Sequence, residues 1–219
     1  MLHVHQPRSG RRITPAEIEA LRVPLEAAFQ ALIAQPSIAQ IRGASLTADI
    51  NISVKPTHDG EHLVVGILTL RAKKILLDSP STVLIGGRYQ TPDLEGDTLD
   101  VVLNPYELIA NRDVQTMAQA GTVMYARAGR QMILLVSDEP EPPGWTARRA
   151  ADALARDRSW YSSGPGAHPM AITVRGPSHT GQELVSGRLD PAAPMARLAA
   201  AAFMVDWAAL HSTVIGRPA

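Results

Sequence analysis

Histidines with a carboxylate at short spacing are the residues of this sequence that could bind a metal or move a proton. His58, Glu61 and His62 form an H-x-x-E-H pattern, which binds zinc through its two histidines when all three residues lie on one helix. Asp59 and Gly60 interrupt the pattern, and strand-like segments flank it on both sides. We therefore interpret it as the solvated tip of a hairpin.

Two other groups could hold a metal. His3 and His5 would share one face of a strand, but no acidic partner is identifiable beside them in the sequence. A downstream cluster of acids could bind Mg²⁺ and consists of Asp93, Glu95, Asp97 and Asp100. The restriction-nuclease pattern that uses such acids also needs a lysine downstream, and the last lysine of the chain is Lys74. The sequence therefore predicts no metal and no other cofactor.

Loop histidines give an enzymatic alternative. His168 and His179 fall in segments rich in glycine and proline, and Glu183 follows four residues after His179. A hydrolase or phosphate-handling enzyme could use these three residues, with arginines from residues 145–158. The sequence has neither a G-x-S-x-G nucleophile elbow nor a phosphate-binding P-loop. The leading interpretation is therefore non-catalytic.

Arginines on a predicted helix over residues 145–161 give a second alternative. Arg149 and Arg156 would share one helix face, with Trp145 near enough to stack on a nucleotide base. Two aspartates of the same helix offset part of this charge through pairs within the helix. A nucleic-acid-binding protein would contact phosphates through Arg149 and Arg156.

The composition narrows the function classes. The chain has 219 residues, a formal net charge of zero and no cysteine. Zero net charge argues against wholesale attraction to nucleic acid or to an anionic membrane, and the lack of cysteine excludes disulfides and thiolate chemistry. Arginine far outnumbers lysine, which is typical of a GC-rich bacterium or of its mobile elements. No apolar signal segment or membrane-length run is evident, so we expect a cytoplasmic protein.

The elements that must position these residues centre on residues 44–77. Apolar and polar residues alternate over residues 46–54, and a more apolar run follows over residues 63–70. Asp59 and Gly60 between the two runs favour a turn. The pattern therefore predicts a long antiparallel hairpin.

Further elements are predicted on both sides of this hairpin. Thr14 and Glu17 form a capping box that begins a helix over residues 14–35, and Pro24 predicts a kink inside it. Residues 1–13 are expected to be a frayed terminus. Further strands are predicted over residues 82–90, 99–103, 122–127, 131–137, 170–175 and 182–189. Further helices are predicted over residues 104–120, 145–161 and 190–211.

These elements predict an α+β fold: an antiparallel sheet of six to eight strands with two to four packed helices. We expect a single domain over residues 1–219, with a candidate internal boundary at the acidic, proline-rich residues 138–144.

The helix predicted over residues 190–211 is apolar around most of its circumference, and Phe203, Trp207 and Leu210 widen its apolar face. A helix of this kind is either central in its own fold or docked on a partner. We therefore expect a non-catalytic binding or assembly protein that contacts a protein partner, or a second copy of itself, through this helix.

Overall fold

The structure is a computed structural model that describes residues 1–7, 10–56, 62–90, 95–105, 114–120, 123–136 and 170–214. Its strands are β1 (Leu2–His5), β2 (Ala44–Pro56), β3 (His62–Lys74), β4 (Val83–Ile85), β5 (Arg88–Gln90), β6 (Asp97–Leu103), β7 (Val114–Ala120), β8 (Val123–Ala128), β9 (Gln131–Val136) and β10 (Met170–Arg175). Helices of the described ranges are α1 (Pro15–Ile33), α2 (Pro36–Ala39), α5 (Ser178–Ser186), α6 (Pro194–Met204) and α7 (Trp207–Val214).

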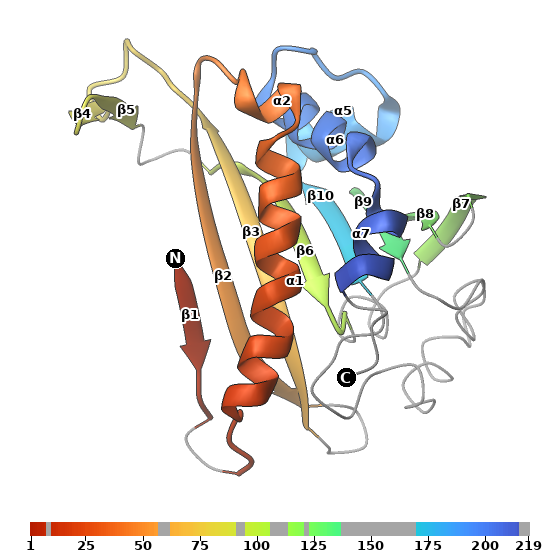
Figure 1. Ribbon diagram of the computed structural model, residues 1–219. Helices are drawn as coiled ribbons and strands as arrows, with labels where there is room; N and C mark the ends of the chain where they lie inside the picture. The colour runs from red at the N-terminus through yellow and green to blue at the C-terminus, as the bar shows by residue number, and fades with distance from the viewer. Residues whose placement is uncertain are drawn as a thin grey trace.

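Eight strands form one sheet in the order β1-β2-β3-β6-β10-β9-β8-β7, and β4 with β5 forms a separate two-stranded sheet. Neighbouring strands of the large sheet are antiparallel except β1 and β2, which are parallel. Figure 1 shows the long strands beside α1, with the β4–β5 hairpin extending from one end. The predicted α+β class and strand number are confirmed.

The predicted central hairpin is also confirmed. β2 and β3 pair from Ala44 opposite Lys74 to Pro56 opposite His62, in one uninterrupted register. This register places every apolar side chain of the alternating run on one face, because successive residues of a strand point to opposite faces. His62 is the first residue of β3, whereas His58 and Glu61 lie outside the described residues.

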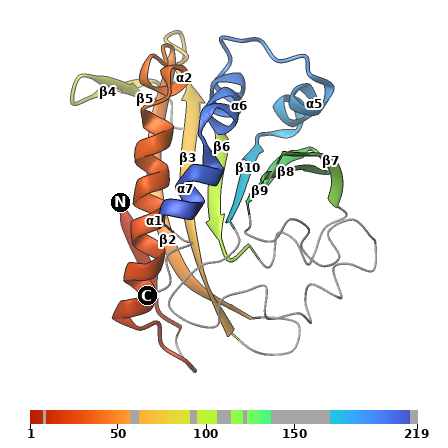
Figure 2. The same cartoon turned by 45° about the vertical axis from the view of Figure 1, so that its right-hand side comes forward.

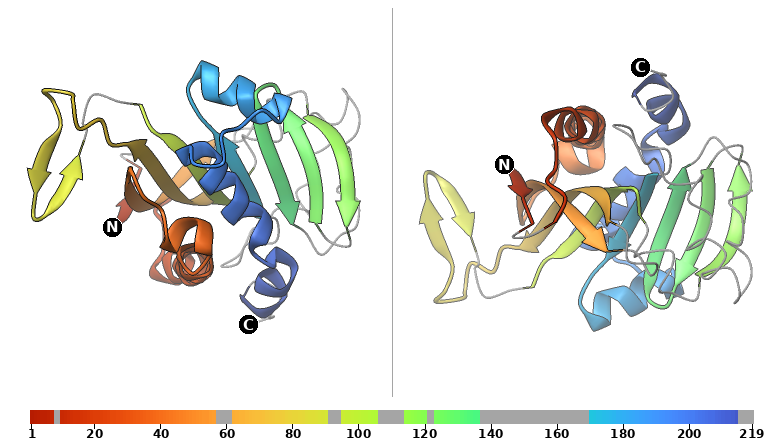
Figure 3. Two further views of the ribbon diagram at one scale, coloured as in Figure 1. Left: turned by 90° about the horizontal axis from the view of Figure 1, so that it is seen from above. Right: turned by 90° about the horizontal axis from the view of Figure 1, so that it is seen from below.

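The sheet carries its main helical layer on one face. α1 packs on β2, β3 and β6, while α6 packs on β3, β6 and β10. Seen from above, α1 and α7 lie on the same side of the sheet (Figure 3). The largest side chains buried on this face include Leu25, Leu32, Ile52, Leu68, Leu70, Leu99 and Leu103. Burying such aliphatic groups is the main stabilising contribution in a core with few aromatic residues.

The helix α1 begins as its sequence predicts. The Thr14 side chain accepts a hydrogen bond from the Glu17 amide, and the Glu17 carboxylate accepts one from the Thr14 amide at 2.9 Å. Pro24 does not divide this helix, which runs as one element from Pro15 to Ile33. Pro24 is buried, so packing of the same face that holds Leu21 and Leu25 offsets the missing hydrogen bond.

Several predicted elements are wrong or incomplete. The single strand predicted over residues 82–90 is two short strands, β4 and β5, which form a separate sheet. Residues 1–13 are not simply a frayed terminus, because Leu2–His5 forms the edge strand β1. Within the described part of the predicted helix over residues 104–120, Val114–Ala120 is the strand β7. Residues 182–189 were expected to be a strand, yet Ser178–Ser186 is the helix α5.

The predicted helix over residues 190–211 is two helices, α6 and α7. The break falls at Val205 and Asp206, where the Asp206 carboxylate accepts a hydrogen bond from the Ala209 amide at 2.9 Å. An aspartate in this position caps a new helix, and it therefore separates α7 from α6. The candidate boundary at residues 138–144 lies outside the described residues.

No helix within the described ranges combines the length and the apolar character that crossing a membrane requires.

Candidate functional site

Three residues at one end of the sheet align across three neighbouring strands. Arg71 on β3 lies opposite Thr98 on β6, and Thr98 lies opposite Arg175 on β10. Side chains of directly opposed residues project from the same face with Cβ atoms about 5 Å apart. Lys73 lies two residues beyond Arg71 and therefore projects from that face as well. Two guanidinium groups thus flank one hydroxyl, with an ammonium group beside them.

These residues line an open polar pocket of about 460 Å³, which we call the strand-end pocket. Its lining residues are Arg71, Lys73, Glu95, Gly96, Thr98, Arg175, Gly176 and Pro177. Three of them are cations and one is an acid. The pocket lies where β10 ends and α5 begins, at the upper end of the sheet in Figure 2.

A buried aspartate holds one of the arginines. The Asp100 carboxylate accepts a hydrogen bond from Thr69 Oγ1 at 2.7 Å and another from Arg175 Nε at 2.9 Å. The Asp100 side chain is 8% exposed, whereas that of Arg175 is 51% exposed. Because the bond uses Nε, both terminal amino groups of the Arg175 guanidinium can contact a ligand.

A second aspartate fastens the rim of the pocket from the helix-bearing face. Asp97 Oδ1 accepts a hydrogen bond from Thr180 Oγ1 at 2.9 Å, and the Met195 amide also donates to this carboxylate. Met195 is in the first turn of α6, whose own N-cap residue makes no side-chain cap. Asp97 therefore caps α6 from β6 and ties the start of α5 to the same strand.

The environment of Asp97 also changes its proton affinity. Burial raises the pKa of the Asp97 carboxyl, and the Thr180 hydrogen bond, the His179 charge and the Met195 amide oppose this only in part. The nearby Glu183 carboxylate raises the pKa further. Protonation of Asp97 would therefore alter the hydrogen bonds that hold the starts of α5 and α6 to β6.

Two glycines allow the chain to close around this pocket. A Cβ atom on Gly96 would lie 2.6 Å from Arg71 Cγ and 2.9 Å from Lys73 Cγ. A Cβ atom on Gly176 would lie 2.3 Å from Asp97 Oδ1 and 2.2 Å from Thr180 Oγ1. A side chain at Gly96 would displace the pocket residues Arg71 and Lys73, and one at Gly176 would disturb the hydrogen bond between Asp97 and Thr180 beside the pocket.

The residues of the enzymatic alternative are placed only in part. His179 and Glu183 both lie on α5, are exposed, and act electrostatically on the buried Asp97. The structure therefore brings His179 near the Asp97 carboxylate, but neither residue is among the described lining residues of the strand-end pocket. His168, Arg149 and Arg156 lie outside the described residues.

The three predicted binding residues of the C-terminal helix have different surroundings. Trp207 is 2% exposed, and its indole N–H donates to the Ala202 carbonyl at 2.6 Å. Leu210 is partly buried against the core. Phe203 is 51% exposed and stacks on Tyr125 with ring centroids 5.8 Å apart. Of the three, Phe203 is the residue that offers an open surface.

The N-terminal histidines do have polar neighbours, supplied by β2. His3 Nε2 lies 3.7 Å from Asp49 Oδ1, and His5 Nε2 lies 3.1 Å from Asn51 Oδ1. Among the described residues, no group of three or more His, Cys, Asp or Glu has an arrangement that could hold a metal ion. Both histidines therefore pair with β2 side chains along the sheet edge.

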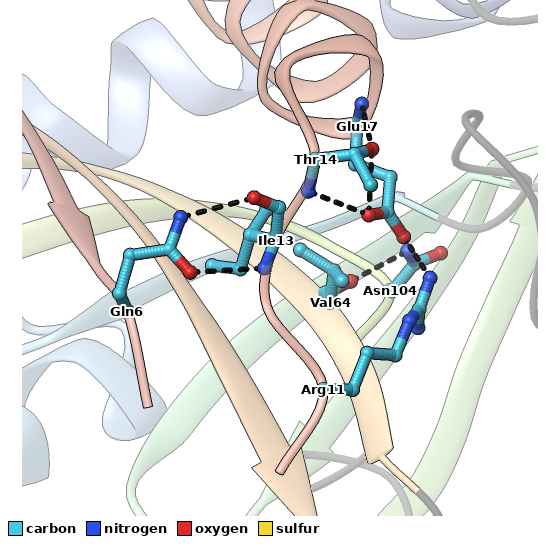
Figure 4. Close-up of polar contacts among 7 residues, drawn as sticks. All are labelled: Gln6, Arg11, Ile13, Thr14, Glu17, Val64 and Asn104. Carbon is cyan, nitrogen blue, oxygen red and sulfur yellow. Dashed lines mark hydrogen bonds and ion pairs between the residues drawn. The ribbon is translucent and has the colours of Figure 1, made fainter. Parts of the chain in front are cut away.

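A polar cluster at the other end of the sheet stabilises the start of α1 (Figure 4). The Gln6 side chain exchanges two hydrogen bonds with the backbone of Ile13, at 2.9 and 3.0 Å. Arg11 forms an ion pair with the buried Glu17 carboxylate. Burial raises the pKa of Glu17, but the Thr14 hydrogen bonds and the Arg11 charge outweigh it and lower the pKa. These contacts stabilise the fold, because they join the segment that follows β1 to the start of α1.

Asn104 belongs to the same cluster and follows β6. It adopts a left-handed backbone conformation with φ of 56°, which asparagine tolerates better than most residues. Its side-chain N–H₂ donates to the Val64 carbonyl at 2.9 Å, while its buried Oδ1 has no hydrogen-bond partner among the described residues. The Asn104 side chain therefore ties the end of β6 to β3.

Comparison with protein-family models, with curated proteins and with solved structures finds no match to this chain. The candidate site is therefore defined by the geometry of the chain's own residues.

Sequence reasoning missed most of this site. Asp97 and Asp100 were grouped as one acidic cluster, but both lie in β6 and their side chains point to opposite faces. Arg175 and Thr98 carried no motif at all. The available signal was the alternation in β3, which puts Arg71 and Lys73 on the face opposite the buried Leu70.

Proposed function

We propose that this chain is a binding protein whose strand-end pocket takes an anionic group, a phosphate or a carboxylate. The observation that carries the proposal is the aligned row in which Arg71 and Arg175 flank Thr98. Guanidinium groups donate paired hydrogen bonds to oxyanions, so an anion between Arg71 and Arg175 can accept hydrogen bonds from both sides.

The charge around the pocket supports the same ligand class. The described lining residues include three cations and one acid, Glu95, in a chain whose formal net charge is zero. Asp100 neutralises part of the Arg175 charge and fixes its position. A concave site with an excess of one sign concentrates counter-ions of the opposite sign.

Isothermal titration calorimetry with inorganic phosphate at low ionic strength tests the proposal. Arg71 is the residue to change, because it is exposed and no hydrogen bond or ion pair of the described residues uses it. One charge-assisted hydrogen bond is worth about 1.5–3 kcal/mol, so Arg71→Gln should weaken phosphate binding by roughly 10- to 100-fold.

Arg12→Gln is the matched control, because Arg12 is exposed and precedes α1 at the far end of the sheet. It should bind phosphate as the wild type does. Equal affinity of the Arg71→Gln variant and the wild type would refute the proposed site.

Assembly through protein contacts is the second candidate, and one surface favours it. Leu84, Ile85 and Tyr89 of the β4–β5 hairpin are 60%, 56% and 48% exposed. A lone two-stranded hairpin is marginally stable, and apolar side chains on its surface favour contact with another protein. The predicted interface on the C-terminal helix is smaller than expected, because Trp207 is buried within the chain.

A further inference from the structure

A second cationic pocket lies on the helix-bearing side of the sheet, between α2 and α6. We call it the helix-side pocket. It has a volume of about 510 Å³ and is lined by Ala39, Gln40, Ile41, Arg42 and Arg197. Arg42 follows α2 and Arg197 lies in the second turn of α6, so segments far apart in the sequence bring the two guanidinium groups to one cavity.

Among the described residues, the charges of this pocket have no counter-charge. None of its described lining residues is acidic, and neither Arg42 nor Arg197 forms an ion pair with another described residue. Two like charges held at one cavity repel each other unless an anion lies between them. The electrostatics therefore point to an anionic ligand, as they do in the strand-end pocket.

Both pockets open at the same end of the sheet. Gly43, directly after Arg42, accepts a backbone hydrogen bond from Ile75 at 2.8 Å, and Ala44 lies opposite Lys74. Arg42 is therefore adjacent to the end of β3, the strand that carries Lys73 into the strand-end pocket. Figure 1 shows α2, α5 and α6 at this one end.

We propose that a single-stranded nucleic acid binds across this end of the sheet, with phosphates in both pockets. The inference rests on the proposed anion site in the strand-end pocket and extends it to a polymer. A small anion fills one pocket, whereas a phosphodiester chain carries a charge at every nucleotide and can occupy two. The pockets lie on opposite sides of the sheet end, so a flexible strand reaches both and a stiff duplex does not.

An exposed aromatic residue on the same helix fits this class of ligand. Phe203 lies near the end of α6, is half exposed, and stacks nearly parallel on Tyr125 at an interplanar angle of 16°. Proteins that bind single strands combine a cationic track with aromatic rings on which bases stack. Phe203 offers such a ring on the element that carries Arg197.

The test is fluorescence anisotropy with a labelled oligothymidylate, measured over a range of salt concentrations. Four phosphate contacts should give a slope of log affinity against log salt of about −3 for a single strand. Arg42→Gln combined with Arg197→Gln should reduce the slope to about −1.4 and weaken binding at least tenfold. This double variant should keep the phosphate affinity of the strand-end pocket, and Arg12→Gln should change neither measurement.

The outcomes separate this inference from the proposed function. If phosphate binding needs Arg71 but oligonucleotide binding does not change in the Arg42 and Arg197 variant, the proposed nucleic-acid ligand is wrong and the anion site stands. If the wild type binds neither phosphate nor the oligonucleotide, both the anion site and the nucleic-acid ligand are wrong. If an unlabelled duplex displaces the labelled oligonucleotide as well as an unlabelled single strand does, the preference for single strands is wrong. Displacement by single strands alone would support that preference.

Discussion

Gly176→Ala should be one of the most damaging single-methyl changes in the described part of this chain. The new Cβ would lie 2.2 Å from Thr180 Oγ1, 2.3 Å from Asp97 Oδ1 and 2.5 Å from Met195 Cε. The methionine end can move aside, although Met195 is fully buried. The other two atoms form the hydrogen bond that holds α5 to β6, and they cannot move without lengthening it.

The magnitude follows from these two effects. Overpacking in a filled region costs about 1–3 kcal/mol, and losing a hydrogen bond to a carboxylate costs about 1.5–3 kcal/mol. Together they lower the free energy of unfolding by about 3–5 kcal/mol. With a urea m-value of about 2 kcal/mol/M, the unfolding midpoint should fall by roughly 2 M.

Gly187→Ala is the matched control for urea unfolding followed by circular dichroism. Gly187 has a positive φ of 68° and open space around its Cβ position, so this change adds backbone strain of about 1–2 kcal/mol without overpacking. Gly176→Ala should therefore be clearly the less stable variant. If the urea midpoint of Gly176→Ala lies within about 0.3 M of the wild-type midpoint, the described close packing of Gly176 against Asp97 is wrong.

Two further changes test other parts of the structure. Burial raises the pKa of Asp97, so the folded state binds this proton more tightly than the unfolded chain does, and stability should fall as the pH rises through the raised pKa. Asp97→Asn removes this fall, so its free energy of unfolding relative to the wild type should improve as the pH rises from the ordinary aspartate pKa through the raised one. A difference that does not change with pH would contradict the raised pKa. Ile85→Asp alters an exposed side chain of the β4–β5 hairpin, so it should leave the fold intact and convert self-associated protein to monomer in native mass spectrometry. A wild type that is monomeric at every concentration would refute self-association through this hairpin.

The central hairpin and the start of α1 were predictable because their signals are local. The alternation over residues 46–54 requires one buried face, and Thr14 with Glu17 specifies a helix start within four residues. Asp206 was also a visible helix cap, and giving it weight would have divided α6 from α7.

Elements fixed by distant contacts were not predictable in this way. The α5 segment is only nine residues long and has little apolar content, and its start is held by the hydrogen bond between Thr180 and Asp97, which is distant in the sequence. Its end is set by Gly187 in a left-handed conformation, which is typical of a helix C-terminus. Predicting the strand-end pocket from the sequence would require the pairing register of three strands, because only that register brings Arg71 and Arg175 to either side of Thr98.

The measurement that tests the anion site most directly is a phosphate titration of ¹⁵N-labelled protein followed by NMR. Saturable shifts of the backbone amides should concentrate at residues 71–74, 95–98 and 175–177, which surround the strand-end pocket. The same titration of Arg71→Gln should lose these shifts, while Arg12→Gln should keep them. Shifts spread evenly over the exposed arginines, or identical shifts in Arg71→Gln, would contradict the site.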